Sequence, residues 1–224
     1  MKRLLITLLA GLGLLSAGCQ KDNVAPPESQ LTGRVTFQNE AVGVRGQGVV
    51  QLELWQRGEV FRNKIPVLVA QDGTYSATLF DGDYKLTRLR DNGPWQNNTD
   101  SITVQVRGNT VVDVPVQPYY VVRNATFTKS GTAITATCQV SQTAAGRTTE
   151  AVTLFLNSTQ FVDTSNSLFG RNTKSGTDLS NLAQPLTFSQ ALPSTARGVV
   201  YARIGVKTQG VNELYYSPVQ KIEL

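Results

Sequence analysis

Residues 72–89, DGTYSATLFDGDYKLTRL, decide the fold class of this chain. Two Asp-Gly pairs, Asp72-Gly73 and Asp81-Gly82, each precede a short run in which apolar and polar residues alternate. Asp-Gly is a turn dipeptide, and a period of two is typical of a strand that buries one face. The stretch therefore predicts two short β-strands, each entered through a tight turn.

The same pattern extends through the first half of the chain. Strands are expected at 31–37, 48–55, 60–70, 74–80, 84–89, 101–106 and 110–116. The turn residues 107–109 predict that the last two strands form a hairpin. About seven short strands in fewer than about 90 residues are the spacing of a small β-sandwich, here expected over residues 31–118.

A second domain is expected after the junction Gln117-Pro118-Tyr119-Tyr120. Its strands are expected at 121–129, 133–140, 150–157, 186–189, 199–208 and 214–223. Residues 158–181 are rich in Thr, Ser and Asn and predict a long loop with room for one short helical turn. Because no segment shows helical periodicity, the chain is expected to be all-β, with a second sandwich, immunoglobulin-like, over residues 119–224.

The first 18 residues have the pattern of a secretory signal peptide. Lys2 and Arg3 are followed by an apolar run, 4–15, that is shorter than the roughly 20 residues of a spanning helix. The run ends in LSAGC, residues 15–19, which resembles the lipobox of bacterial lipoproteins and implies cleavage before Cys19 and a lipid on its thiol. The alternative is an ordinary secretory signal that happens to precede a cysteine.

The residues after Cys19 suggest where the anchored protein resides. Gln20-Lys21-Asp22 resembles the short charged tag of surface-exported lipoproteins, and Gln20 is not the Asp of an inner-membrane retention signal. Residues 19–30 contain Pro26-Pro27 and are expected to be a lipidated tether. The expected location is the outer membrane, with the body exposed at the cell surface.

The composition excludes several kinds of chemistry. The chain has no histidine, which excludes Ser-His-Asp catalysis and histidine-bound zinc. Without Lys2 and Arg3, the 21 basic residues fall to 19, against 16 acidic ones, and they do not cluster, so no nucleic-acid partner is expected. Cys138 lies on the apolar face of an alternating run and is expected to be a buried, inert thiol.

Acidic residues offer no convincing catalytic or metal site. Asp81-Gly82-Asp83, with Asp72 nearby, is a candidate for Ca²⁺, but that ion needs about six to eight oxygen ligands and Asp-Gly is first a turn signal. A pair of carboxylates could hydrolyse glycosides, yet no pair can be placed from the sequence. We expect no cofactor, no metal and no enzymatic activity.

Trp95 is the candidate binding residue. It lies in the polar loop 90–98, where its ring could stack on a sugar while Asn92, Gln96 and Asn97 bond the hydroxyl groups. The alternative is that Trp95 folds back over the end of the first sandwich.

Several motifs together resemble a two-domain lipoprotein family of unknown function from the Bacteroidetes. They are residues 72–75, 79–84, 93–95 and 116–120, and in the second half 161–163 and 201–206. The first domain is also similar to the transthyretin-like modules attached to carboxypeptidases. Members of the lipoprotein family tend to be encoded beside outer-membrane glycan importers and their starch-binding-type lipoproteins, which implies a role in glycan acquisition.

The sequence therefore predicts a non-catalytic surface lipoprotein that assists glycan uptake and binds carbohydrate weakly. The alternative is a scaffold that binds no ligand and packs against an outer-membrane transporter and its starch-binding-type lipoprotein. Tyr119 and Tyr120, at the junction, are the expected interface residues.

Overall fold

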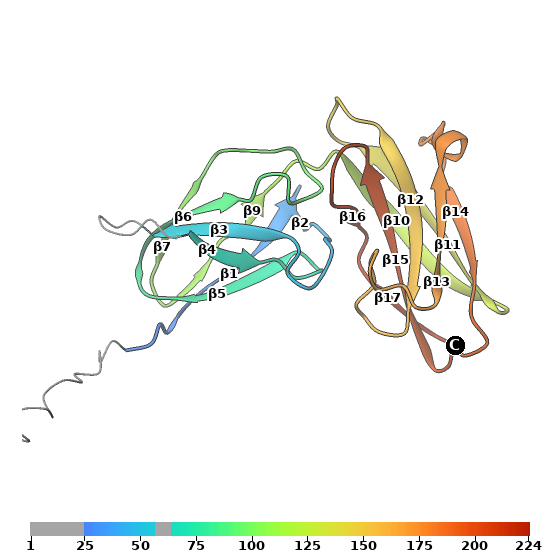
Figure 1. The fold of residues 1–224 in the computed structure, drawn as a ribbon, viewed down its shortest axis with the longest axis horizontal. Helices are drawn as coiled ribbons and strands as arrows, with labels where there is room; N and C mark the ends of the chain where they lie inside the picture. Colours follow the sequence, from blue (N-terminus) through green and yellow to red (C-terminus); the bar gives the residue numbers. More distant parts are fainter. Residues whose placement is uncertain (1–24, 57–63) are drawn as a thin grey trace, which may run out of the picture.

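The computed structural model of the chain describes residues 25–56 and 64–224, and these fold into two all-β domains (Figure 1). The first contains β1 (Ser29–Phe37), β2 (Glu40–Ala41), β3 (Gln51–Gln56), β4 (Lys64–Leu68), β5 (Thr74–Leu79), β6 (Gly82–Arg88), β7 (Ile102–Val106), β8 (Asn109–Val111) and β9 (Val114–Pro115). The second contains β10 (Tyr120–Ser130), β11 (Ala133–Gln142), β12 (Thr149–Asn157), β13 (Gly170–Ser175), β14 (Leu186–Ala191), β15 (Val199–Thr208), β16 (Tyr215–Tyr216) and β17 (Gln220–Glu223). The expected signal peptide and Cys19 lie outside the described residues. In the described ranges, no helix is long and apolar enough to cross a membrane.

The described residues of the first domain form two sheets. One is antiparallel, in the order β4-β3-β6-β7. The other is built on β1, which pairs with β2 and β5 in antiparallel fashion and with β8 and β9 in parallel. The alternating residues Leu52, Leu54 and Leu86 are at most 1% exposed and form part of the core. The prediction of an all-β first domain is thus confirmed.

The hairpin predicted for residues 101–116 is wrong. β7 pairs with β6, whereas β8 and β9 pair with β1 in the other sheet. Gly108, at a φ of +56°, turns the chain, and its N–H donates to Ser29 Oγ (3.0 Å) and Asp81 Oδ1 (3.2 Å). A turn signal marks where the chain reverses, but the next strand joins whichever sheet offers it free backbone groups.

The second domain also has two sheets. One has the order β10-β11-β14, and the other has the order β13-β12-β15-β16, with β17 also paired to β15. Ile134, Leu154 and Ile204, from three strands, are fully buried. The hydrophobic periodicity of this half of the chain therefore predicts its strands well.

The region predicted as a long loop, residues 158–181, contains more structure than expected. It includes a 3₁₀ turn, Gly176–Leu179, in keeping with the predicted helical turn, but also β13, which pairs with β12. The β13 sequence, GRNTKS, has no large apolar residue and forms the edge of its sheet. A polar edge strand lacks the periodicity on which the sequence prediction relies.

The predicted strand at 214–223 is divided in two. β16 and β17 both pair with β15, but residues 217–219 interrupt them. Pro218 has no N–H to donate to a ladder, which explains the break.

Cys138 is buried as predicted. It is 1% exposed on the inner face of β11, together with Ile134, Ala136 and Val140. Burial raises the pKa of its thiol to about 12, so the thiolate is not formed at neutral pH.

Candidate functional site

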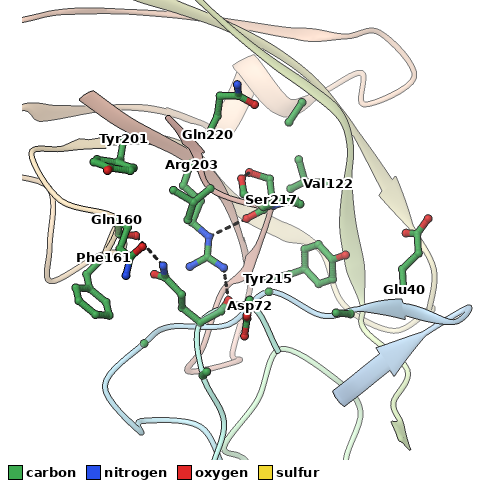
Figure 2. A pocket seen from close by; sticks show the side chains of 18 of the residues that line it. Glu40, Asp72, Val122, Gln160, Phe161, Tyr201, Arg203, Tyr215, Ser217 and Gln220 are labelled. Atoms are coloured by element: carbon green, nitrogen blue, oxygen red, sulfur yellow. Dashed lines mark hydrogen bonds between the residues drawn. The ribbon is translucent and has the colours of Figure 1, made fainter. Parts of the chain in front are cut away.

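The two domains contact each other through a buried arginine, Arg203 of β15, which is 1% exposed (Figure 2). Its Nε donates to the carbonyl oxygen of Ser217 in its own domain (2.7 Å). Its Nη1 and Nη2 donate to the carbonyl oxygens of Val44 (2.9 Å) and Gln71 (2.6 Å) in the first domain. The guanidinium also lies over the ring of Tyr216, with 4.5 Å between Cζ and the ring centroid.

The positively charged side chain of Arg203 is bonded by uncharged groups, the backbone carbonyl oxygens. Burial lowers its pKa to about 10, which still leaves it charged at neutral pH. It forms no ion pair with the described residues. Its planar fork of donors suits several carbonyl oxygens at once, which a lysine could not bond in the same way.

Two further contacts fix the domains beside Arg203. The N–H of Tyr216 donates to the carbonyl oxygen of Gly43 (3.0 Å), and Arg45 pairs with the buried carboxylate of Glu213 (2.6 Å). A β carbon at Gly43 would lie 2.4 Å from the Tyr216 oxygen and 2.7 Å from Arg203 Nη2, so only glycine fits here. These directional bonds hold the two domains in one arrangement.

A groove of about 1340 Å³ opens beside this contact and has walls from both domains. Its aromatic side chains are Phe127, Phe161, Tyr201 and Tyr215. Its amide side chains are Asn39, Gln47, Gln71, Asn124, Gln160 and Gln220. Glu40 and Arg123, which pair with each other across the domains, also line it.

One end of the groove combines exposed rings with amides. Phe161 is 46% exposed, and Figure 2 shows its ring and that of Tyr201 on the same side of Arg203, with Gln160 next to them. Gln71 Nε2 donates to the carbonyl oxygen of Gln160 (2.7 Å) and links the two walls. The Oε1 atom of Gln71 is buried and accepts no hydrogen bond from the described residues. This end offers an apolar surface beside an unused polar acceptor.

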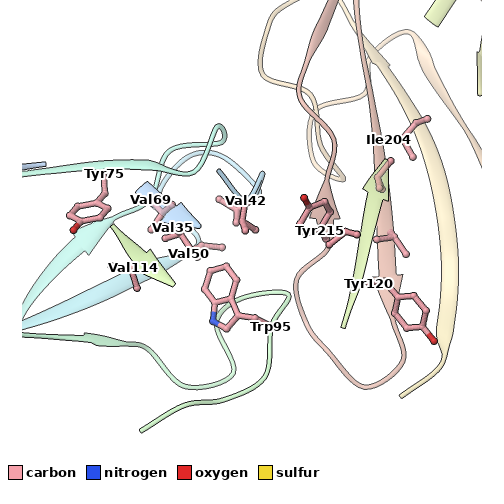
Figure 3. Close-up of a cluster of buried hydrophobic side chains, with 14 of the residues drawn as sticks. Val35, Val42, Val50, Val69, Tyr75, Trp95, Val114, Tyr120, Ile204 and Tyr215 are labelled. Carbon is pink, nitrogen blue, oxygen red and sulfur yellow. The ribbon is translucent and has the colours of Figure 1, made fainter. Parts of the chain in front are cut away.

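Trp95 does not offer its ring to a ligand, which corrects the expectation of a stacking platform there. It is 5% exposed and lies in the first-domain core, near Val35, Val50 and Val114 (Figure 3). A β carbon at Gly93 would lie 2.2 Å from two atoms of the indole ring, so the loop packs closely over it. The alternative considered above, in which Trp95 folds back over the end of the sandwich, describes the structure.

Because the Trp95 ring is buried, the amides of Asn92, Gln96 and Asn97 do not form with it the binding site that the sequence predicted. Asn92 accepts a hydrogen bond from Gln51 N (2.6 Å) and donates one to Val49 O (2.8 Å), which completes the end of β3. Gln96 and Asn97 are exposed and line a hollow of about 620 Å³. No aromatic ring lies among the described residues around that hollow.

The side-chain hydrogen bond of Tyr120 and the cation–π contact of Tyr119 lie inside the second domain. The hydroxyl of Tyr120 donates to the carbonyl oxygen of Arg147 (2.9 Å), and the Arg147 guanidinium lies 5.3 Å from the centroid of the Tyr119 ring. Figure 3 shows Tyr120 pointing away from Trp95, whereas Tyr215 is on the side that faces the first domain. Tyr215 and Tyr216 therefore occupy the place expected for the junction tyrosines.

The aspartates considered for Ca²⁺ brace turns. Asp72 Oδ1 accepts from Thr74 N (3.0 Å) and Thr74 Oγ1 (2.7 Å). The hydrogen bond from Ser29 Oγ to Asp81 Oδ1 (2.5 Å) lowers the pKa of Asp81. Within residues 25–56 and 64–224, no three Cys, Asp or Glu side chains gather in a way that could hold a metal.

The sequence prediction gave no role to Phe161, Tyr201 and Arg203, although two features of the sequence mark them. Phe161, Tyr201 and Arg203 lie in the segments 161–163 and 201–206, which carried the family resemblance without a stated role. Arg203 is a charge in the otherwise apolar run VVYARIGV, residues 199–206. A charge buried in a strand needs partners, and this one finds them in the other domain.

Two family models match the chain. Residues 29–117 match the N-terminal domain of a protein of unknown function, DUF3823, and residues 120–221 match the domain of unknown function DUF3823_C. No functionally curated protein matches.

Solved structures resemble the chain over most of its length. A DUF3823 family protein from Bacteroides ovatus is 38% identical, with a TM-score of 0.81 over 88% of this chain and 99% of that one. A DUF3823 family protein from Parabacteroides merdae is 37% identical, with a TM-score of 0.81 over 89% and 100%. A proposed carbohydrate binding protein from Bacteroides uniformis shares the fold at 22% identity, with a TM-score of 0.72 over 88% and 100%.

Proposed function

This chain belongs to the DUF3823 family, and from that premise we propose that it binds carbohydrate, without catalysis, in the groove between its domains. We propose further that a lipid on Cys19 anchors it to the outer membrane. There it would serve as an accessory to glycan acquisition at the cell surface.

The exposed ring of Phe161 in the groove is the observation that carries the proposal. A pyranose presents an apolar face of C–H groups and a rim of hydroxyl groups, so it binds where an aromatic ring lies beside polar donors and acceptors. Phe161 and Tyr201 provide the rings, while Gln71 and Gln160 provide amides next to them. The free Oε1 of Gln71 is an acceptor that a sugar hydroxyl could satisfy.

The fixed domain arrangement supports the same proposal. Both walls of the groove are held by Arg203, so the site is formed before the ligand arrives. A preformed site avoids the cost of ordering loops on binding. The proposed carbohydrate binding of the Bacteroides uniformis relative is in keeping with this use of the fold.

Affinity electrophoresis of residues 20–224 through gels that contain different polysaccharides tests the proposal. Wild type would be compared with Phe161→Ala and with Phe80→Ala, a matched control because Phe80 is also 46% exposed but lies outside the groove. Loss of one stacking ring should weaken binding by about 1–2 kcal/mol, a factor of about 5–30. Phe80→Ala should migrate like wild type.

Equal retardation of wild type and Phe161→Ala would place the sugar elsewhere. If a broad panel of polysaccharides retarded none of the proteins, the scaffold role would take precedence. Co-purification from native membranes would then be expected to recover an outer-membrane transporter whether or not glycan is present.

A further inference from the structure

A second, smaller hollow lies on the outer face of the sheet β13-β12-β15, with a volume of about 320 Å³. Across this face, Arg171 of β13 stands opposite Phe155 of β12, and in the next same-face row Thr173 stands opposite Thr153. Lys207 of β15 lies one same-face row further on. Among the described residues, the hollow and the groove share no lining side chain.

Positive charge is in excess around this hollow. Its lining contains Arg45, Arg171 and Lys207, but only one carboxylate, that of Glu213. Glu213 is already paired with Arg45 (2.6 Å). Arg171 is exposed and makes no ion pair or side-chain hydrogen bond with the described residues, and Lys207 Nζ reaches only backbone carbonyls, including that of Asn212 (3.1 Å).

The remaining polar groups in the hollow suit an acceptor ligand. The hydroxyl groups of Thr153 and Thr173 bond each other (3.0 Å), and one of them can still donate to a third group. The Nε atom of Arg45 is buried and finds no acceptor among the described residues. Buried donors without acceptors are rare in folded proteins, so this one points to a missing partner.

We propose that the hollow binds an oxyanion, the carboxylate or sulfate group of an acidic ligand, between Arg45, Arg171 and Lys207. Guanidinium groups bind such anions through charge-assisted hydrogen bonds, which are about twice as strong as neutral ones. A metal cation is disfavoured by three positive side chains. The apolar floor, Phe155, is 2% exposed and gives little surface for stacking, so the charge of the ligand decides recognition.

The site needs both domains. Arg45 follows β2 in the first domain, whereas Arg171 and Lys207 belong to the second. The ion pair of Arg45 with Glu213 fixes that guanidinium at the rim of the hollow. The anion site is therefore completed by the same domain contact that builds the groove, although it binds a different chemical group.

Isothermal titration of residues 20–224 with sodium sulfate, sodium glucuronate and glucose, at constant ionic strength, tests the inference. Wild type would be compared with Arg171→Gln and with Arg90→Gln, whose side chain is 80% exposed and does not line the hollow. Loss of one charge-assisted bond should weaken anion binding about tenfold. Arg90→Gln should bind like wild type.

The two anions separate the possible sources of the ligand. Glucuronate binding at least about tenfold tighter than sulfate would identify an acidic saccharide, and preference for sulfate a free oxyanion. Both results uphold the site if Arg171→Gln weakens binding. Glucose binding as tight as that of glucuronate, or no anion binding up to about 10 mM, would overturn it.

Two controls keep the result interpretable. If Arg171→Gln failed to fold, Arg171→Lys, which keeps the charge but lacks the planar fork of donors, should bind sulfate more weakly than wild type, and binding equal to that of wild type would count against the site. Phe161→Ala should leave sulfate binding unchanged. Loss of carbohydrate binding in the groove and loss of anion binding in the hollow can therefore be observed separately.

Discussion

Replacement of Arg203 by methionine should uncouple the two domains. The guanidinium donates to the carbonyl oxygens of Val44, Gln71 and Ser217, two of them in the first domain. Methionine is unbranched and apolar, two atoms shorter than arginine and without a donor, so it removes the bonds while filling part of the space. The perturbation therefore tests whether these bonds hold the domains together.

The expected loss of stability follows from the groups left behind. Gln71 O retains a second donor, Val44 N (3.1 Å), but the buried carbonyl oxygens of Val44 and Ser217 lose their only donor among the described residues, and that of Val162 loses a weaker one at 3.4 Å. An unsatisfied buried carbonyl costs about 1–3 kcal/mol, so the carbonyl oxygens of Val44 and Ser217 alone cost about 2–6 kcal/mol. Relief of the buried charge offsets part of this, and we expect a net loss of about 3 kcal/mol.

Urea denaturation and small-angle X-ray scattering would measure the effect. The variant should unfold in two transitions, show a larger radius of gyration and lose about 6–12 °C in Tm, since about 1 kcal/mol corresponds to about 2–4 °C for a chain of this size. Arg88→Met is the matched control, because Arg88 also bonds a carbonyl, that of Pro115 (2.7 Å), but within the first domain. It should lower stability without changing the scattering profile.

One pattern of results would contradict this role of Arg203. If Arg203→Met unfolded in a single transition within about 0.5 kcal/mol of wild type, with unchanged scattering, the buried bonds would not hold the domains. The domain contact would then have to rest on the remaining contacts, chiefly the ion pair of Arg45 with Glu213 and the bond between Tyr216 and Gly43.

Three further predictions test separate parts of the structure. Trp95→Ala should lower the free energy of unfolding, measured in urea, by about 3–5 kcal/mol, because the ring is 5% exposed. The folded fraction of this variant should still be retarded by glycan like wild type. A stable Trp95→Ala that no longer binds glycan would restore Trp95 as the binding residue. Gly43→Ala should lower the free energy of unfolding by at least about 1–3 kcal/mol, because its β carbon would overlap with Tyr216. The β carbon of Gly46→Ala meets no atom nearer than 3.5 Å, so the stability of that variant should be close to that of wild type. Equal stability of the two variants would contradict the close contact at Gly43. Burial raises the pKa of the Cys138 thiol to about 12, so its contribution to stability is present below pH 9 and declines as the pH rises toward 12. The urea midpoint of wild type should therefore fall more steeply above pH 9 than that of Cys138→Ala. Parallel curves for the two proteins would show that the thiol is not buried.

The sequence predicts the fold class because the relevant signals are local. Alternation identifies strands such as β5 and β6, and the Asp-Gly pairs identify the turns that precede them. Pairing partners are not local: the chain after Gly108 joins β1, more than 70 residues away, and no turn residue specifies that choice. The edge strand β13 is missed for a related reason, since its polar residues need no apolar face.

The functional site is less predictable because it is assembled between domains. Trp95 is the conspicuous aromatic in a polar loop, yet the loop turns the ring inward against the sheet. The exposed ring, Phe161, lies in a stretch without periodicity, and its neighbour Gln71 comes from the other domain. Arg203 was visible as a charge in an apolar strand, but its partners are carbonyl oxygens, which every residue has and no sequence pattern marks.

The use of backbone carbonyl oxygens as partners of Arg203 affects which side chains can change as the protein diversifies. The domain contact at Arg203 depends on backbone oxygens, so the side chains at positions 44, 71 and 217 can change without loss of the acceptors. Gln71 gives its carbonyl oxygen to Arg203 and its side chain to the groove. New ligand preferences could therefore arise by single substitutions along the groove while the arrangement of the domains is inherited unchanged, provided that Arg203 and Gly43 are retained.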